Sequence, residues 1–305
     1  MEPLPGFNAS STTGINDLGE VVGESSIQNQ YPDRPVATVW RDGRPAGFAA
    51  GLSPSTAAAI NRHGQVVGTL LSPPRSTSRT FRVLSRGRPP ALLPGRNSWG
   101  TAINDVGTIV GHVRDMFRTR AYVHQDGRMT LLDVPGDYVA SKGLNNAGVV
   151  VGVSVWDGGH NGWIFDHDVL TELPISTDAV AINSSGVVLV SRWGRENTDA
   201  SLYINGRLET LPSPAGADEC QAMALNDRNV AVGICHRMDG SPVVVRWSDG
   251  DVVDLSNLIS DGSGDGWFLT AVSGINGAGQ IAGWGWITDP QGEYVRRAFL
   301  LSPVP

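Results

Sequence analysis

The tryptophans, histidines and arginines of this chain are spread unevenly along it. Three of the nine tryptophans lie in short alternating segments typical of strands, and the other six fall in the variable stretches between such segments. Histidines, arginines and acidic residues share these stretches. Aromatic rings can stack on a ligand, and guanidinium groups form charge-assisted hydrogen bonds to an anion. The mixture therefore predicts a site for an aromatic or anionic small molecule.

The candidate ligand-binding residues all come from the variable stretches. They are Trp99, Arg114, Asp115, Trp156, Arg192, Trp193, His236, Trp267, Trp284 and Trp286. A single tryptophan is more often a packing residue than a ligand contact. The expectation of a binding site therefore rests on the six tryptophans as a set.

Two ionisable residues are the candidate catalytic groups. Glu24 and His112 occupy equivalent positions in a repeated pattern, where the other repeats place Thr69, Val153, Ser191, Ile234 and Trp284. In a symmetric ring, equivalent positions form a circle about the axis. We therefore expect Glu24 and His112 to face a common cavity, where a carboxyl and an imidazole could act as general acid and base.

One repeated phrase defines the elements that would carry these residues. It reads GINDLGEVVG from Gly14 and AINDVGTIVG from Ala102, and it occurs seven times with small changes. Its asparagines are Asn16, Asn61, Asn104, Asn145, Asn183, Asn226 and Asn276, which lie 38 to 50 residues apart. Self-similarity at this spacing is typical of propeller blades.

The chemistry of the phrase favours a tight hairpin between two strands. An Asn side chain can accept a hydrogen bond from the backbone two residues further on. The Gly three residues after the Asn suits a positive φ angle, and the sixth repeat has Asn229 there, the next best residue for it. Each phrase is followed by an alternating run, such as AYVHQDG from Ala121, and by a shorter apolar run. Each repeat therefore predicts four short strands.

These units predict an all-β fold: a single domain over residues 1–305 that forms a seven-bladed β-propeller of four-stranded antiparallel blades. A superhelical β-solenoid is the structural alternative. The last repeat runs out of residues after three strands. We therefore expect the ring to be closed by the N-terminal strand, with Met1 to Pro5 beside Arg296 to Leu301. Pro3 and Pro5 suit an outermost strand, which need not donate outward.

The repeated phrase resembles that of the HAF-repeat family, and the resemblance covers essentially the whole chain. The final segment, from Gly266 to Asn276, is similar to the C-terminal repeat of that family. Members are often described as extracellular proteins without an assigned activity. The resemblance thus implies a repeat fold and leaves the function open.

Bulk properties exclude several classes. A net charge of −7 argues against nucleic-acid binding, and no run of 18 apolar residues predicts a membrane-spanning helix. The N-terminus shows no secretion signal, so we expect a soluble cytoplasmic protein, or an extracellular one if a signal peptide was removed.

No cofactor motif is present. The stretch from Asp261 to Gly266 resembles the start of a calcium loop, but Val272 stands where the ligand Glu belongs, so no metal is expected.

The only two cysteines, Cys220 and Cys235, flank the turn of the sixth repeat. Folding that hairpin about Asp227 to Asn229 places them opposite each other. We expect their Cα atoms about 4.4–6.8 Å apart, within disulfide reach, and the thiols reduced as in most cytoplasmic proteins.

Two function classes follow from these patterns. The first is a redox-cofactor-independent enzyme of the cyclase, isomerase or lyase type, acting on a small molecule at the face that carries the long connections. The second is a non-catalytic propeller that binds a ligand or a protein partner. The aromatic, His-bearing stretches favour the first, and the missing catalytic signature favours the second.

Overall fold

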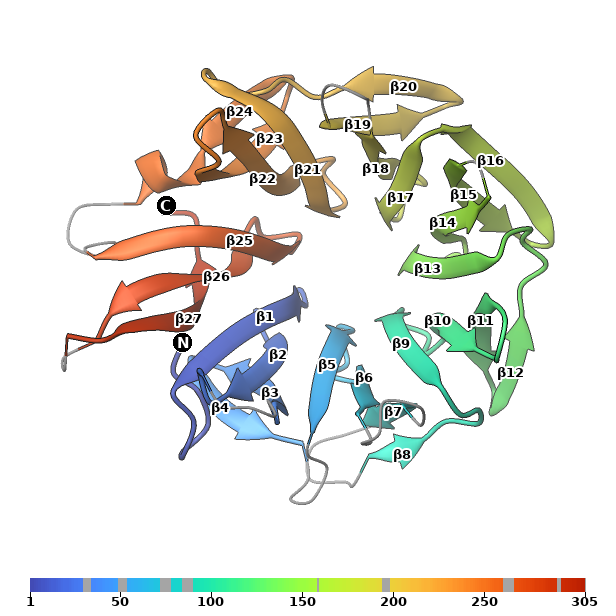
Figure 1. Ribbon diagram of the computed structural model, residues 1–305, viewed down its shortest axis with the longest axis horizontal. Coiled ribbons are helices and arrows are strands. Elements are labelled where there is room, and N and C mark those ends of the chain that lie inside the picture. The colour runs from blue at the N-terminus through green and yellow to red at the C-terminus, as the bar shows by residue number, and fades with distance from the viewer. Residues whose placement is uncertain are drawn as a thin grey trace.

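The computed structural model describes residues 1–29, 34–48, 54–71, 78–83, 90–157, 159–193, 198–259, 266–289 and 292–304. Short antiparallel strands are arranged around a central axis (Figure 1). The first sheet has the order β1-β2-β3-β4. Its strands are β1 (Ala9–Ile15), β2 (Val21–Ser26), β3 (Val36–Arg41) and β4 (Arg44–Gly47). The innermost strand comes first in the chain, and the strands then proceed outward.

Three further sheets repeat this four-stranded order. The second sheet has β5 (Ser55–Ile60), β6 (Val66–Leu70), β7 (Arg79–Val83) and β8 (Ala91–Leu92). Another has β17 (Thr177–Ile182), β18 (Val188–Trp193), β19 (Thr198–Ile204) and β20 (Arg207–Thr210). The next has β21 (Ala217–Leu225), β22 (Ala231–Arg237), β23 (Pro242–Ser248) and β24 (Asp251–Asp254), followed by the short 3-10 helix η2 (Leu255–Leu258).

A larger, eight-stranded sheet joins two consecutive repeats. It contains β9 (Ser98–Ile103), β10 (Ile109–Arg114), β11 (Thr119–Gln125), β12 (Arg128–Leu131), β13 (Tyr138–Leu144), β14 (Val150–Trp156), β15 (Gly159–Asp166) and β16 (Val169–Ile175). The two halves are linked by one parallel pair, Thr119 opposite Tyr138. Among the described residues the last sheet has three strands: β25 (Trp267–Ile275), β26 (Ile281–Thr288) and β27 (Tyr294–Leu301).

The strands therefore form a β-propeller with four-stranded antiparallel meanders. The prediction of seven separate blades, however, is wrong. The described residues contain five sheets of four or more strands, and a sixth sheet of three. The expected closure by an N-terminal strand is also wrong, because Met1 to Pro5 form no strand. The two prolines lack the N–H groups that a ladder needs. The Leu4 N–H donates instead to the Ser25 side chain, at 3.0 Å.

The turns of the repeated phrase form as expected. The Asn16 side chain accepts from the backbone N–H of Leu18 at 3.1 Å and of Glu20 at 2.9 Å. Gly19 has a φ angle of +75°, and Asn229 takes the same role in the sixth repeat with a φ angle of 59°. Local side-chain chemistry therefore fixes where each first strand ends and the second begins.

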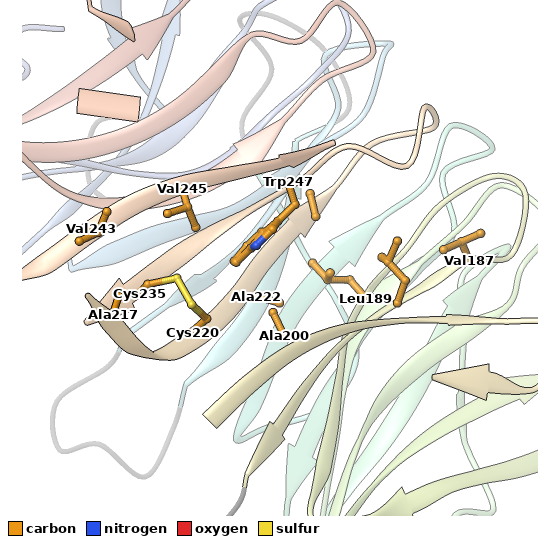
Figure 2. Packing of buried hydrophobic residues seen from close by; sticks show 12 residues of the cluster. Val187, Leu189, Ala200, Ala217, Cys220, Ala222, Cys235, Val243, Val245 and Trp247 are labelled. Atoms are coloured by element: carbon orange, nitrogen blue, oxygen red, sulfur yellow. A yellow bond between two sulfur atoms is a disulfide. The ribbon is translucent and has the colours of Figure 1, made fainter. Parts of the chain in front are cut away.

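The core lies between neighbouring sheets and is lined by third-strand aromatic residues. Trp40, Trp163 and Trp247 are completely buried, as expected from the alternating pattern. Figure 2 shows Trp247 among small residues of its own sheet and Leu189 of the preceding one. A Cβ on Gly233 would meet the Trp247 ring at 2.7 Å, so only glycine leaves room for the indole there.

The hairpin register of the two cysteines is confirmed, while their expected redox state is not. Cys220 lies directly opposite Cys235, and a disulfide joins them with the Cα atoms 4.0 Å apart (Figure 2). The Cα separation falls just below the expected range, and the expectation of reduced thiols is wrong for this structure. The disulfide is buried against Ala217 and Val243.

Within the described residues, no helix has the length and apolar character that crossing a membrane would require.

Candidate functional site

The asparagines of the repeated phrase form a closed ring of hydrogen bonds about the axis. Each side chain donates its Nδ2 to the backbone carbonyl of the asparagine in the next repeat. The order is Asn16, Asn61, Asn104, Asn145, Asn183, Asn226 and Asn276, with distances of 2.9 to 3.2 Å, and Asn276 donates to Asn16 at 3.1 Å. All seven are buried. The first and last repeats are thus joined by this contact rather than by a shared strand.

A small polar cavity of about 200 Å³ lies over this ring at the mouth of the axis. Its rim consists of the residue that follows each asparagine, including Asp17, Arg62, Asp105 and Asp227. These side chains are already used between repeats. The Asp17 carboxylate accepts from the Gly277 N–H, and the Asp105 carboxylate accepts from the Arg62 N–H. The cavity is therefore a hydrogen-bonded junction rather than an open set of ligand groups.

His112 lies in an aromatic cluster at the opposite end of the first two strands. Its ring stacks on Trp99, with the centroids 5.2 Å apart and the planes at 18°, and lies 6.2 Å from the Tyr138 ring. The cluster forms because His112 on β10 is directly opposite Trp99 on β9, and because β13 follows in the next repeat. His112 Nδ1 is buried and has no hydrogen-bond partner among the described residues.

The environment keeps the His112 imidazole neutral. Burial disfavours the charged ring, and the nearby Lys142 ammonium adds repulsion, so the pKa of His112 falls from 6.5 to about 4. A base with a pKa of about 4 holds almost no protons at neutral pH. It can accept a hydrogen bond there, but it is poorly matched to general acid–base catalysis near pH 7.

Glu24 lies in a different part of the ring from His112. Its carboxylate accepts from the Ser11 hydroxyl at 3.3 Å and lies 3.9 Å from the Arg296 guanidinium of the last sheet. Arg296 in turn lies over the Trp284 ring, 5.8 Å from its centroid. The nearby Trp286 stacks on Tyr294, with centroids 5.3 Å apart. This second cluster fills the junction between the last and first sheets.

The structure thus brings the predicted site residues together as two clusters and leaves others apart. His112 and Trp99 form one cluster, and Glu24, Trp284 and Trp286 contribute to the other. At an equivalent position, the Ser191 hydroxyl accepts from the Ala222 N–H of the next sheet at 3.1 Å, which is a packing role. The expectation of a common cavity with Glu24 and His112 as acid and base stays a prediction.

The remaining predicted residues are dispersed among several repeats, at or near the ends of their second strands. Asp115 accepts from the N–H groups of Phe117 and Arg118, and these bonds hold the pKa of its carboxyl below the usual range. Trp156 and Arg192 lie near the ends of their strands. Arg114 and His236 likewise lie at or near strand ends. The Trp193 side chain and the calcium-like stretch from Asp261 to Asp265 lie outside the described residues. The part of the chain that is described contains no cluster of metal-ligating side chains.

A groove of about 840 Å³ lies beside the three-stranded sheet. Trp267, one of the predicted residues, lines it and packs edge-on against Phe299, with the centroids 6.0 Å apart. Most of the lining is apolar. It comes from β25, β26 and β27, from η2 with Ile259, from the first sheet, and from the terminal residues: Met1, Leu18, Trp40, Leu255, Leu258, Ile259, Leu269, Ile281, Leu300, Leu301, Pro303 and Val304. The sequence analysis did not predict this groove, which lies beside the last sheet, where the described residues form no fourth strand.

No protein-family model matches the chain, and no curated protein matches it. Solved structures do. The β-propeller domain of the Trilobed protease from Pyrococcus furiosus is similar, with 12% identity and a TM-score of 0.68. The match covers 97% of this chain and 93% of that domain. That domain is described as having an open velcro topology. The fold of this chain is that of a β-propeller. Membership of the HAF-repeat family stays a prediction.

Two peptidases contain a similar propeller. The acylaminoacyl peptidase of Pyrococcus horikoshii matches at 14% identity with a TM-score of 0.61. The puromycin-hydrolyzing peptidase of Mycobacterium tuberculosis matches at 13% identity with a TM-score of 0.62. The chain spans about half the length of each peptidase, 52% and 53%. At these identities the likeness concerns the fold alone.

Proposed function

We propose that this propeller is a binding module whose ligand site is the groove beside β27. The observation that carries the proposal is the groove itself. Its volume of about 840 Å³ falls in the range of about 300–1,000 Å³ expected of ligand sites, and its lining is mainly apolar with a few polar groups. The polar groups include Asp42, Arg246 and Gln280, which would orient a bound molecule.

Other features of the molecule support binding over catalysis. The polar cavity on the axis is about a quarter of this size, and its side chains are occupied by bonds between repeats. The two candidate catalytic residues, Glu24 and His112, have separate partners in separate clusters. The groove is therefore the best candidate for a ligand of appreciable size.

Anilinonaphthalene sulfonate, a dye that fluoresces when its aromatic rings bind an apolar surface, tests whether the groove binds a ligand. We expect saturable dye fluorescence that is lost in the Leu258→Asp variant, because Leu258 lines the groove and is half exposed. The matched control is Val106→Asp, at an exposed valine in the turn of the third repeat, which should leave dye binding unchanged. Equal dye binding by wild type and Leu258→Asp would count against the groove as a site.

A second candidate is the redox-cofactor-independent enzyme, of the cyclase, isomerase or lyase type. The observation in its favour is the buried, unpartnered Nδ1 of His112 between Trp99 and Tyr138. A neutral imidazole in an aromatic environment could position a planar substrate through stacking and one hydrogen bond. In this proposal His112 binds and orients the substrate, and Glu24 would act only if the substrate reached both clusters.

Two variants of His112 test the second candidate. Each is incubated with a panel of aromatic carboxylates, and ligand uptake is measured by mass spectrometry. His112→Phe keeps the stacking on Trp99 and removes the nitrogen, whereas His112→Ala removes both. Loss of ligand uptake in both variants is the expected result for a hydrogen-bonding role. Uptake that survives in His112→Phe would assign the site to stacking alone, and unaltered uptake in both would eliminate it.

A further inference from the structure

The outer edge of β27 differs from the outer edge of the four-stranded meanders. In four of them, an apolar residue after the fourth strand donates its N–H to a third-strand carbonyl. The pairs are Phe48 to Ala37, Leu93 to Thr80, Leu132 to Ala121 and Leu211 to Ala200, at 2.8 to 3.2 Å. The equivalent carbonyl in the last sheet is that of Ala298, and it accepts from the Met1 ammonium at 2.5 Å.

A second contact confirms this equivalence. The Trp247 indole donates to the carbonyl of Pro212, which follows Leu211. In the same way, the Trp40 indole donates to the carbonyl of Glu2, which follows Met1, again at 2.7 Å. Met1 and Glu2 therefore occupy the place where a fourth strand has just ended.

The stretch that a fourth strand would cover lies in the groove. In the complete sheet, Ser201 to Ile204 on β19 pair with Arg207 to Thr210 on β20. Matching Ala200 with Ala298 places the equivalent stretch at Phe299 to Ser302, and all four of these residues line the groove. Because β strands alternate, the N–H and C=O of Leu300 point away from β26 and toward the groove. Among the described residues they have no strand partner on that side.

We propose that the groove binds an extended peptide segment of a partner protein, which adds to β27 as an antiparallel fourth strand. This inference rests on the proposed binding function of the same groove. The fourth strands of this chain show what fits there. In β4, β12 and β20 the second of four residues is half buried and the others are more exposed, and that residue is Pro45, Met129 or Leu208. The partner segment thus needs an apolar residue at its second position.

The physical chemistry of this edge favours strand addition. Unpaired backbone groups on an exposed edge are a template for another chain. The main-chain hydrogen bonds provide affinity, and pockets for alternate side chains provide specificity. Here the Leu300 backbone supplies the bonds, and Leu258 and Trp267 supply apolar contact beside it.

The test uses a capped peptide with the sequence of β20, Arg-Leu-Glu-Thr flanked by glycines, titrated into the full chain by calorimetry and amide NMR. We expect one-to-one binding with shifts confined to Phe299–Ser302 and their neighbours. By the alternation seen in β19 and β20, the third residue of the peptide, Glu, turns its N–H toward β27 and the fourth, Thr, turns it away.

Backbone methylation supplies a matched pair of peptides. N-methylation at Glu should weaken binding at least tenfold, while N-methylation at Thr should leave it nearly unchanged. Equal affinity of the two methylated peptides would overturn strand addition, although the groove would still be a binding site. If neither the peptide nor anilinonaphthalene sulfonate binds, the proposed function fails as well.

A covalent version of the same strand provides a second test. A variant that carries Arg-Leu-Glu-Thr directly before Met1 should fill the groove from within, no longer bind the free peptide, and melt at a higher temperature. Undiminished peptide binding by this variant would place the peptide elsewhere and overturn the proposal. If the wild type forms concentration-dependent dimers and the extension abolishes them, the groove binds a second copy of the chain. That result would also overturn the proposal.

Discussion

The two faces of the ring use equivalent positions in different ways. On the face that carries the Asn turns, each repeat places the same residue at the same point, and seven asparagines make the same contact. At the other end of the same strands, equivalent positions hold an acid in one repeat, an imidazole in another and an indole in a third: Glu24, His112 and Trp284. Uniform bonding on one face therefore holds the repeats together, and leaves the chemistry of the other face free to differ.

A substitution on the face that carries the Asn turns should lower stability the most. Asn145→Ala removes a buried side chain that donates to Asn183 and accepts from Ala147 and Val149. Leaving such groups unpaired costs about 1–3 kcal/mol each, so we expect a loss of about 4 kcal/mol in the free energy of unfolding. Urea denaturation measures this.

The neighbouring Asn146 is the matched control, because it also bonds across repeats, to Asp105, but is exposed. Asn146→Ala should cost less than about 1 kcal/mol, as expected of a hydrogen bond that water can replace. Similar losses for Asn145→Ala and Asn146→Ala would show that burial of the ring does not matter.

On the face opposite the Asn turns, loss of the disulfide should lower stability the most. Cys220 and Cys235 are separated by 15 residues, and closing a loop of that size restricts the unfolded chain by about 3 kcal/mol. The double variant Cys220→Ala/Cys235→Ala should therefore be about 3 kcal/mol less stable than the oxidised protein. Reducing the wild type should reproduce most of this loss, and no change on reduction would contradict it.

His112 should make stability depend on pH. Its pKa is about 4 in the folded protein and 6.5 as the ordinary value, so between these pH values the unfolded chain binds a proton that the folded protein does not. The contribution of His112 to the free energy of unfolding is therefore complete above pH 6.5, decreases as the pH falls, and levels off below pH 4. The loss is about 2 kcal/mol after allowing for partial exposure. The His112→Phe variant should lack this part of the pH dependence in thermal melts.

Glu24 should have the smallest effect. Its carboxylate is partly exposed and lies 3.9 Å from the Arg296 guanidinium, a separation typical of ion pairs worth less than about 1 kcal/mol. Glu24→Gln keeps the shape and should lower stability by no more than that in urea denaturation. A loss as large as that of Asn145→Ala would show that the two faces are equally demanding.

What the sequence predicts well is local. The Asn turns, the positive φ angle at Gly19 and Asn229, and the opposition of Cys220 and Cys235 each depend on a few neighbouring residues. Burial of Trp40, Trp163 and Trp247 follows from simple alternation. These features were predicted because their causes lie within one hairpin or one strand.

What the sequence does not predict depends on contacts between repeats. The asparagine was expected to close its own turn, yet its Nδ2 also reaches the next repeat, a distance that no local rule supplies. The pair Thr119 and Tyr138 merges two repeats into one sheet. Pro3 and Pro5 lack the N–H groups that a ladder needs, and Met1 to Pro5 form no strand. The groove beside β27 lies where the described residues of the last sheet form no fourth strand, whereas the sequence pattern pointed to the tryptophans.

The ring of amides also has a direction. Six of the asparagines donate to the repeat that follows in the chain, and Asn276 makes the same kind of contact with Asn16 in the first repeat. Because the same contact joins every pair of neighbouring repeats, it does not depend on which connection contains the chain ends. An inserted repeat, or a circular permutation that moved the ends to another connection, would therefore need no new type of contact on this face.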